Sequence, residues 1–244
     1  MLKLICANWK MNKTEKSAVS LVKNIEKVLK NNKNNIVVFS SFPYLKSVKE
    51  NTKKIKVGAQ NCSAEAEGAF TGEVSAKQIK EFCSYVLIGH SERRRYQKET
   101  DKEIASKVVN AISAGLKVVL CVGEDINERK SGKTFNVIKN QLLNDLSLVS
   151  RGKMKNIIVA YEPIWSLSTT KNRTDCSQES AKDAVLLIND IINKKFHAKV
   201  KVLYGGNVNP EDAETYLSIS EYAGVLVGGA SLDAKKFISI IKKV

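Results

Sequence analysis

The chain has 244 residues, 43% of them hydrophobic, and carries 40 basic against 25 acidic residues, a net charge of +15. This length exceeds the usual single domain, but barrels that alternate strands and helices reach it with one core. The longest apolar runs, such as residues 117–122, are strand-sized and too short to cross a bilayer. Five cysteines without a C-x-x-C pair indicate a reducing compartment, so we expect a cytoplasmic protein. No long apolar stretch lies near the N-terminus, so we expect no signal peptide.

The excess positive charge is compatible with nucleic-acid binding or with the attraction of small anions. Along the chain the lysines occur in many segments, for example at Lys46, Lys53, Lys139 and Lys242, without the interleaved aromatic residues of an RNA-binding sheet. We therefore expect solvated faces and phosphate attraction, with no membrane partner and no specific nucleic-acid partner. Any association with nucleic acid should fade with salt.

Strand-like and helix-like segments alternate along the whole chain. Eight apolar runs are predicted to be strands: residues 2–7, 36–39, 55–59, 85–89, 117–122, 157–161, 200–204 and 224–227. Amphipathic stretches lie between them, with apolar residues at helical spacing, as at Ala18, Val22, Ile25 and Leu29 and again at Val185, Ile188, Ile191 and Ile192.

Continuous apolar strands separated by helices favour a parallel sheet covered by helices. Eight such repeats predict an α/β fold in which residues 1–244 form a single closed (β/α)8 barrel domain. A doubly wound open sheet has the same periodicity and remains an alternative.

Charged and polar residues follow three of the predicted strands. The first strand ends in Asn8-Trp9-Lys10, where the lysine would meet an incoming anion. His90 follows the fourth strand, and a helix starting there would favour its neutral imidazole, which could donate a hydrogen bond to an oxyanion. Because the carboxyl ends of parallel strands share one rim, these side chains are predicted to meet there.

The sixth strand ends at Glu162, and the following Pro163 biases this residue away from helix. The proline thus fixes a carboxylate at the carboxyl end of a strand, where the chemistry of parallel α/β proteins takes place.

The last two strands are followed by paired glycines, Gly205-Gly206 before Asn207 and Gly228-Gly229. Glycine lets backbone N–H groups approach a ligand closely, and loops after strands seven and eight bind phosphate in many barrels. The sequence therefore predicts an anion site at this part of the rim.

Two other patterns are rejected. Residues 131–134 read Ser-Gly-Lys-Thr, but the glycine that a P-loop needs at position 127 is Asn127. Only two histidines, His90 and His197, are present, and no carboxylate cluster compensates, so no metal site is expected.

Taken together, these motifs resemble those of the triosephosphate isomerase family. The matching segments are residues 8–12, 58–61, 68–73, 89–94, 121–124, 160–165 and 227–231. The resemblance implies a TIM barrel and the interconversion of dihydroxyacetone phosphate and D-glyceraldehyde 3-phosphate through an enediolate, in glycolysis and gluconeogenesis. It also implies that neither a metal nor an organic cofactor takes part.

The resemblance further implies roles for individual residues. Glu162 would be the base, His90 the electrophile, Lys10 the cation, Asn8 a hydrogen-bond donor and Glu92 the partner that orients Lys10. The substrate phosphate would be bound by the rim and lid residues Gly206, Asn207, Gly228, Gly229 and Ser168. Thr71 resembles the loop residue that family dimers insert into the neighbouring subunit, so a homodimer is expected.

The lid, residues 166–173, departs from the family pattern. Ser168 and Thr170 stand where the family usually has glycines, and Asn207 replaces a serine that ordinarily meets the lid. We expect a lid that closes with ordinary backbone angles or under strain, with the Asn207 amide reaching the lid near Thr170.

Two alternatives were weighed against this function. One is a barrel kept mainly for binding, which the joint presence of Asn8, Lys10, His90, Glu92 and Glu162 disfavours. The other is a barrel isomerase acting on a phosphoribosyl substrate, which the lack of a second acidic strand end disfavours.

Overall fold

The computed structural model describes residues 2–29 and 32–244. Eight parallel strands close into a barrel in which each strand pairs with the next along the chain, and β8 pairs with β1. The strands are β1 Leu4–Asn8, β2 Asn35–Ser40, β3 Lys56–Ala59, β4 Tyr85–Ile88, β5 Lys117–Val122, β6 Ile157–Tyr161, β7 Lys201–Tyr204 and β8 Gly224–Val227. All eight predicted strands are confirmed within two residues, and the open-sheet alternative is wrong because the sheet closes.

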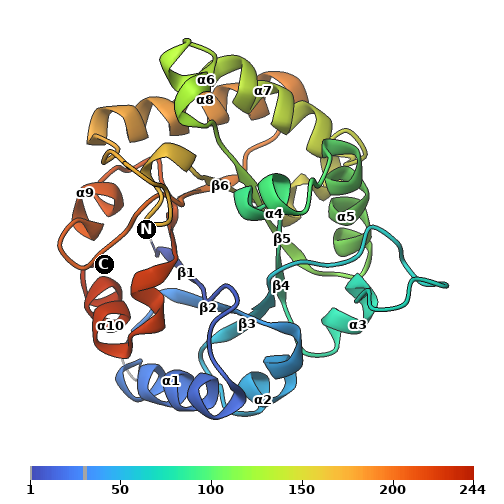
Figure 1. The fold of residues 1–244 in the computed structure, drawn as a ribbon, viewed down its shortest axis with the longest axis vertical. Coiled ribbons are helices and arrows are strands. Elements are labelled where there is room, and N and C mark those ends of the chain that lie inside the picture. The colour runs from blue at the N-terminus through green and yellow to red at the C-terminus, as the bar shows by residue number, and fades with distance from the viewer. Residues whose placement is uncertain (1, 30–31) are drawn as a thin grey trace.

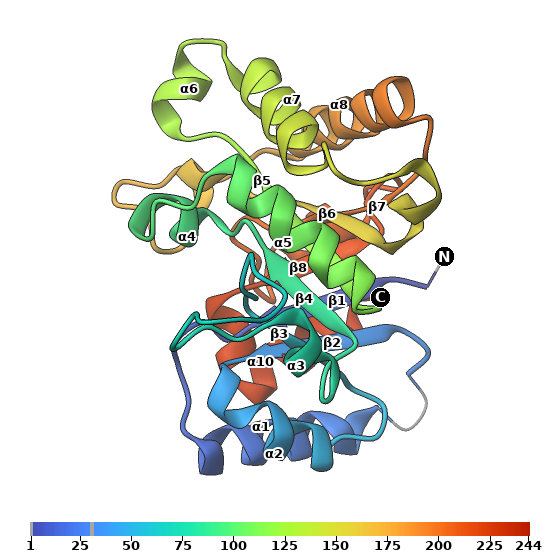
Figure 2. The same cartoon turned by 90° about the vertical axis from the view of Figure 1, so that its right-hand side faces the viewer.

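Helices surround the barrel, as Figure 1 shows in a view into the ring and Figure 2 from the side. The α-helices are α1 Glu15–Val28, α2 Leu45–Glu50, α3 Ala76–Lys80, α4 Ser91–Tyr96, α5 Asp101–Ser113, α6 Ile126–Lys130, α7 Thr134–Asp145, α8 Gln178–Phe196, α9 Ala213–Leu217 and α10 Ala234–Lys242. Short 3-10 helices are η1 Phe42–Tyr44, η2 Arg151–Asn156, η3 Ile164–Ser166 and η4 Gly229–Leu232.

The apolar spacing noted in the sequence forms the buried faces of these helices. In α1 the buried residues are Ala18, Leu21, Val22 and Ile25, and in α8 they include Val185, Ile188, Ile191 and Ile192. Side-chain caps fix several starts, since the Thr100 hydroxyl accepts from the Glu103 N–H and the Asp125 carboxylate accepts from the Asn127 N–H. Helix position therefore follows from both burial and capping.

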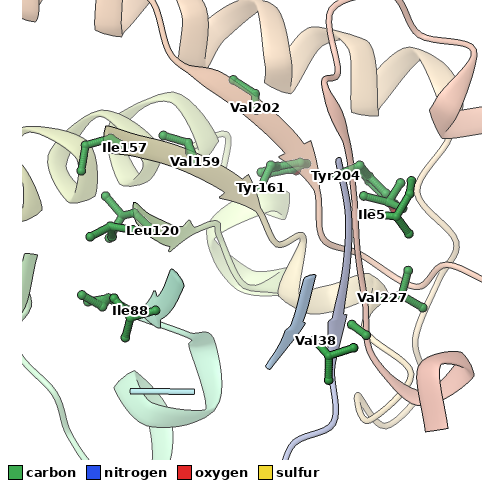
Figure 3. Close-up of a cluster of buried hydrophobic side chains, with 14 of the residues drawn as sticks. Ile5, Val38, Ile88, Leu120, Ile157, Val159, Tyr161, Val202, Tyr204 and Val227 are labelled. Atoms are coloured by element: carbon green, nitrogen blue, oxygen red, sulfur yellow. The ribbon is translucent and has the colours of Figure 1, made fainter. Parts of the chain in front are cut away.

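Buried side chains form two apolar clusters, one inside the barrel and one between the strands and the helices. Leu4 and Cys6 belong to the inner cluster, whereas Ile5 and Ala7 belong to the outer cluster. Figure 3 shows part of the outer cluster, including Val159, Tyr161 and Val202 on β6 and β7. Successive side chains of a strand point to opposite faces, which produces this division.

The same alternation aims two of the polar residues into the barrel mouth. Asn8 lies two residues after the inward-facing Cys6 of β1, and Glu162 lies two residues after the inward-facing Ala160 of β6. Both residues are almost completely buried, at 4% and 2% exposure. Strand register thus brings an amide and a carboxylate to the carboxyl-terminal rim.

Candidate active site

Glu162 is held by backbone on one side and by α4 on the other. Its N–H donates to the carbonyl of Val122 at 2.8 Å, which continues the pairing of β5 and β6. The Oε2 atom accepts the backbone N–H of Ser91 at 3.1 Å, and Oε1 lies 3.1 Å from Nε2 of His90. The carboxylate therefore accepts one hydrogen bond, from Ser91, and contacts the His90 ring, although it is shielded from water.

Two glycines make room for this glutamate. A Cβ atom on Gly123 would lie 1.9 Å from the Glu162 carbonyl oxygen, a distance that no side chain can adopt. A Cβ atom on Gly205 would lie 3.2 Å from Cγ of Glu162, which is tighter than an ordinary contact. The Gly205 N–H also donates to the Tyr161 carbonyl at 2.7 Å, so the end of β7 fixes the strand end that carries Glu162.

The hydrogen bonds of His90 define its tautomer. His90 precedes α4 as its N-cap, and its Nδ1 atom accepts the backbone N–H of Glu92 at 3.2 Å. A nitrogen that accepts an N–H carries no proton, so the ring is neutral and its proton is on Nε2. The expected helix start at His90 is confirmed, and the Nε2–H faces the Glu162 carboxylate.

Lys10 is oriented from three sides. Its Nζ atom lies 2.6 Å from Oε1 of Glu92, and its backbone N–H donates to Oδ1 of Asn8 at 3.0 Å. The Gln60 amide donates to the Lys10 carbonyl at 2.9 Å. These contacts hold Lys10 at a left-handed φ of 52°, an uncommon conformation for a residue other than glycine. Glu92 thus holds the Lys10 ammonium in place.

A small cavity joins these groups to the glycine loops. Its lining includes nine of the predicted site residues: Asn8, Lys10, His90, Glu162, Ser168, Gly206, Asn207, Gly228 and Gly229. The cavity measures about 20 Å³, room for roughly one water molecule. A ligand larger than water therefore requires the lid to move before it can enter. Glu92 stands outside this lining beside Lys10, and Thr71 lies exposed in the loop after β3.

The lid lies over the cavity, and hydrogen bonds within the lid region hold it there. Ser168 lines the cavity, with its Oγ atom 4.0 Å from the point where Gly229 would carry a Cβ. The Thr170 hydroxyl donates to the Ile164 carbonyl, and the Thr170 N–H donates to the Leu167 carbonyl at 2.9 Å. These two bonds join Thr170, in the middle of the lid, to the residues at and just before its start.

The lid has ordinary backbone angles at the two positions where the family has glycines, but it lacks the expected contact with Asn207. Ser168 and Thr170 both have ordinary negative φ angles, and within the lid only Asn172 adopts a positive φ, of 53°. The expected contact between the Asn207 amide and the lid backbone near Thr170 is not formed, because the Thr170 N–H already donates to the Leu167 carbonyl.

Sequence reasoning missed the group that anchors the start of the lid. Glu124 is fully buried and accepts hydrogen bonds from the Trp165 indole at 3.0 Å and the Tyr161 hydroxyl at 3.1 Å. Arg129 lies over the Trp165 ring at 4.2 Å and 3.5 Å from Glu124. Burial raises the pKa of Glu124, an effect that the Trp165 hydrogen bond opposes. In the sequence, Glu124 was noted only as the last residue of the family segment 121–124, without a role of its own.

A second unanticipated group lies beneath the His90 loop. Arg94 donates to the Gly89 carbonyl at 2.8 Å and to the Cys121 carbonyl at 3.4 Å, which joins the ends of β4 and β5. The guanidinium also pairs with Asp101 at 2.6 Å and with the fully buried Asp145. Loss of hydration outweighs the ion pair and raises the pKa of Asp145 to about 7. No sequence pattern placed Asp145 beside Arg94.

The described part of the chain contains neither a metal-binding cluster nor a membrane-spanning helix. Within residues 2–29 and 32–244, no group of three or more histidine, cysteine or acidic residues is arranged to hold a metal ion. The same residues contain no helix that combines the length and apolar character needed to cross a membrane.

Comparison with known proteins supports a single family. The family model described as "Triosephosphate isomerase" matches residues 3–244. The triosephosphate isomerases of Alkaliphilus metalliredigens and Syntrophotalea carbinolica are 40% and 42% identical to the chain; each alignment covers 98% of this chain, and 98% and 96% of the respective relative. The crystal structure of triosephosphate isomerase from Bartonella henselae matches with a TM-score of 0.89 at 32% identity, covering 100% of this chain and 99% of that one.

Proposed function

Since the chain belongs to the triosephosphate isomerase family and interconverts dihydroxyacetone phosphate with D-glyceraldehyde 3-phosphate, we propose that the rim around Glu162 is its active site. The reaction belongs to glycolysis and gluconeogenesis. The observation that carries the proposal is the 3.1 Å contact between the Glu162 carboxylate and the Nε2 atom of a neutral His90.

Glu162 is the proposed base. It removes a proton from the substrate carbon next to the carbonyl and returns it to the former carbonyl carbon. His90 moves the hydroxyl proton from one enediolate oxygen to the other, so the carbonyl and hydroxyl exchange places. Its carboxylate is 2% exposed, which limits competition from water for the proton. Its hydrogen bond from the Ser91 N–H and its contact with Nε2 of His90 must give way to substrate, because each engages one of the two carboxylate oxygens.

His90 is the proposed electrophile. Its Nε2–H donates to the substrate oxygen on which negative charge develops as the enediolate forms. The backbone N–H of Glu92 occupies Nδ1, so the ring has one tautomer available and needs no reorientation to place its proton on Nε2. Lys10, held by Glu92, supplies positive charge to the same oxygens and to the phosphate, and Asn8 contributes a side-chain amide.

The proposed phosphate site is formed by Gly206, Asn207, Gly228, Gly229 and Ser168. The N–H groups of Gly206 and Asn207 donate to no acceptor among the described residues, so they are free to bind phosphate oxygens. The Ser168 hydroxyl closes the cavity from the lid side. A single phosphate would therefore be enclosed by backbone donors below and the lid above.

We also infer a homodimer. A second cavity of about 460 Å³ lies beside the active site and shares Asn8, Lys10 and His90 with it. Met11 and Tyr96 in its lining are 96% and 65% exposed, which is unusual for side chains of this size. The Thr71 loop of a second subunit would fill this cavity and bury both. Residues 1–244 would act as one domain in the cytoplasm, without a metal or organic cofactor.

A direct assay tests the proposed function. Purified protein is mixed with D-glyceraldehyde 3-phosphate, and formation of dihydroxyacetone phosphate is followed through a coupled NADH-dependent dehydrogenase, with and without EDTA. We expect turnover that EDTA does not change. An absence of turnover in freshly purified, dimeric protein would contradict the proposal.

A further inference from the structure

The positive charge of the chain is concentrated in two stretches of sequence. Residues 1–56 and 233–244 together contain 17 basic and 4 acidic residues, a net charge of +13. The remaining 176 residues contain 23 basic and 21 acidic residues, a net charge of +2. Nearly all of the excess charge thus comes from little more than a quarter of the chain.

The fold brings these two stretches to one side of the barrel. Helix α1 packs between α2 and α10, and Figures 1 and 2 show the three helices next to one another. We call the exposed lysines on or directly after these helices the basic face: Lys16, Lys23, Lys27, Lys46, Lys49, Lys53, Lys235, Lys236, Lys242 and Lys243. The expectation of dispersed charge is therefore wrong: the excess positive charge lies in two stretches of the sequence, and the fold places these stretches side by side.

Little of this charge is neutralised within the molecule. Among the described residues, only Lys46 and Lys243 of the basic face form ion pairs, at 4.0 Å to Glu50 and 3.4 Å to Glu214. Two nearby acids serve the backbone instead. Glu26 accepts the N–H groups of residues 53–55, and Asp233 caps α10 by accepting the Lys236 N–H at 2.9 Å.

The basic face is separate from the proposed active site. None of its ten lysines lines the active-site cavity or the larger cavity beside it. Their charge is therefore not needed at the position where the triose phosphate binds, and they can be replaced without touching the catalytic groups.

We propose that the basic face binds the phosphate backbone of double-stranded nucleic acid without sequence preference. Lysines are point charges suited to phosphate, and residues 1–56 and 233–244 contain no arginine, the residue that most often reads base edges. Neighbouring packed helices are about 8–10 Å apart. Lysine rows at that separation can reach the phosphate strands on either side of a groove about 12 Å wide.

The surface chemistry disfavours two other anionic partners. Base stacking on single strands requires exposed aromatic rings, and α1, α2 and α10 present none among the large exposed side chains. Insertion into lipid requires bulky apolar residues, and Val28, at 42% exposure, is the large apolar side chain that these three helices expose. The basic face presents positive charge, and a nucleic-acid phosphate backbone can be bound by positive charge alone.

The test compares two variants of equal net charge. One replaces Lys23, Lys27, Lys235 and Lys242 by Gln, and the control replaces Lys153, Lys155, Lys182 and Lys195, which are exposed on η2 and α8. Binding to two unrelated 24-base-pair DNA duplexes is measured by fluorescence anisotropy between 25 and 200 mM KCl. Isomerase kcat/KM is measured alongside and should not change in either variant.

We expect the wild type to bind both duplexes equally and to weaken steeply with salt. Each lost phosphate contact lowers the slope of log K against log salt by about 0.9, so the basic-face variant should lose a slope of up to about 3.6. Its affinity at 25 mM KCl should fall at least about tenfold, while the control stays within about twofold.

Four results would overturn the proposal: no binding of the wild type at 25 mM KCl, equal weakening in both variants, preference for one duplex, or association with phosphatidylserine vesicles but not DNA. None of them depends on the assignment of the catalytic residues.

Discussion

The Nε2 atom of His90 lies 3.1 Å from Oε1 of Glu162, so the proposed electrophile and the proposed base are in contact with each other. In the neutral ring this Nε2 atom carries the proton. With substrate present, the same proton is required at the substrate oxygen. Binding must therefore exchange a Glu162–His90 contact for two contacts to substrate, which couples substrate entry to the positioning of the base.

Replacing Glu162 by Gln removes the proton acceptor while keeping the size of the side chain. We expect kcat to fall by at least about 10²–10⁴-fold, the usual contribution of a positioned base, with a normal circular dichroism spectrum. Affinity for inorganic phosphate, measured by calorimetry, should change little because the glycine loops are intact. The control is Glu179→Gln on the exposed start of α8. Near-normal kcat in Glu162→Gln would remove this residue from the mechanism.

Replacing Thr71 by Arg tests the inferred dimer. The larger, charged side chain would meet Lys10 and Arg93 around the neighbouring cavity, so we expect a monomer in sedimentation velocity. Activity should fall more than about tenfold because the cavity that adjoins Asn8 and Lys10 is then open to water. Thr215→Arg adds the same charge on α9 and serves as the control. A dimer that persists in Thr71→Arg would show that this loop is not the contact.

Replacing Thr170 by Val keeps the shape of the side chain but removes the hydrogen bond to Ile164. A hydrogen bond of this kind contributes about 0.5–1.5 kcal/mol, so kcat/KM should fall about two- to tenfold if the bond holds the closed lid. The lid keeps water from the enediolate, and a looser lid should release more methylglyoxal by phosphate elimination. Thr169→Val is the matched control. Equal methylglyoxal yields in wild type and Thr170→Val would argue against this role.

Replacing Asp145 by Asn should change how stability depends on pH. Because the folded-state pKa of Asp145 is raised to about 7, above the ordinary value of about 3.9 for an unfolded chain, the folded state binds more protons between these values. Ionisation of Asp145 therefore costs stability progressively as pH rises from about 4 to 7. Asn cannot ionise, so the free energy of unfolding of Asp145→Asn relative to wild type should increase over this range.

Urea unfolding at pH 4.5, 6 and 7.5 and constant protein concentration measures this difference. Asp183→Asn, on the exposed side of α8, is the control and should show no such trend. A constant difference between Asp145→Asn and wild type at all three pH values would contradict the raised pKa.

The strands and the catalytic rim could be predicted because both depend on local patterns. Each apolar run is long enough to be a strand and too short to be a helix, and the polar residue after the run must lie at the carboxyl end. His90, Lys10 and Glu162 come from different strands, yet closure of a parallel barrel brings all such ends together. For the same reason the glycine pairs after the last two strands line the same cavity as these residues.

Contacts between distant side chains could not be predicted. Nothing in the sequence around Asp145 indicates Arg94, and nothing around Thr170 indicates that its hydroxyl donates to the Ile164 carbonyl and its N–H to the Leu167 carbonyl. The basic face was not predicted, because only the packing of α1 against α2 and α10 brings its lysines together.

Gly123 and Gly205 pack against Glu162 and leave little room for a side chain, so they limit which positions around the site can be changed. No side chain fits at Gly123, because its Cβ would overlap the Glu162 backbone. The position of the base is thus determined by main-chain geometry, whereas the lid that covers the substrate is made of replaceable side chains such as Ser168 and Thr170. Directed evolution toward longer phosphorylated sugars should therefore accumulate changes in residues 166–173 while the two glycines remain unchanged.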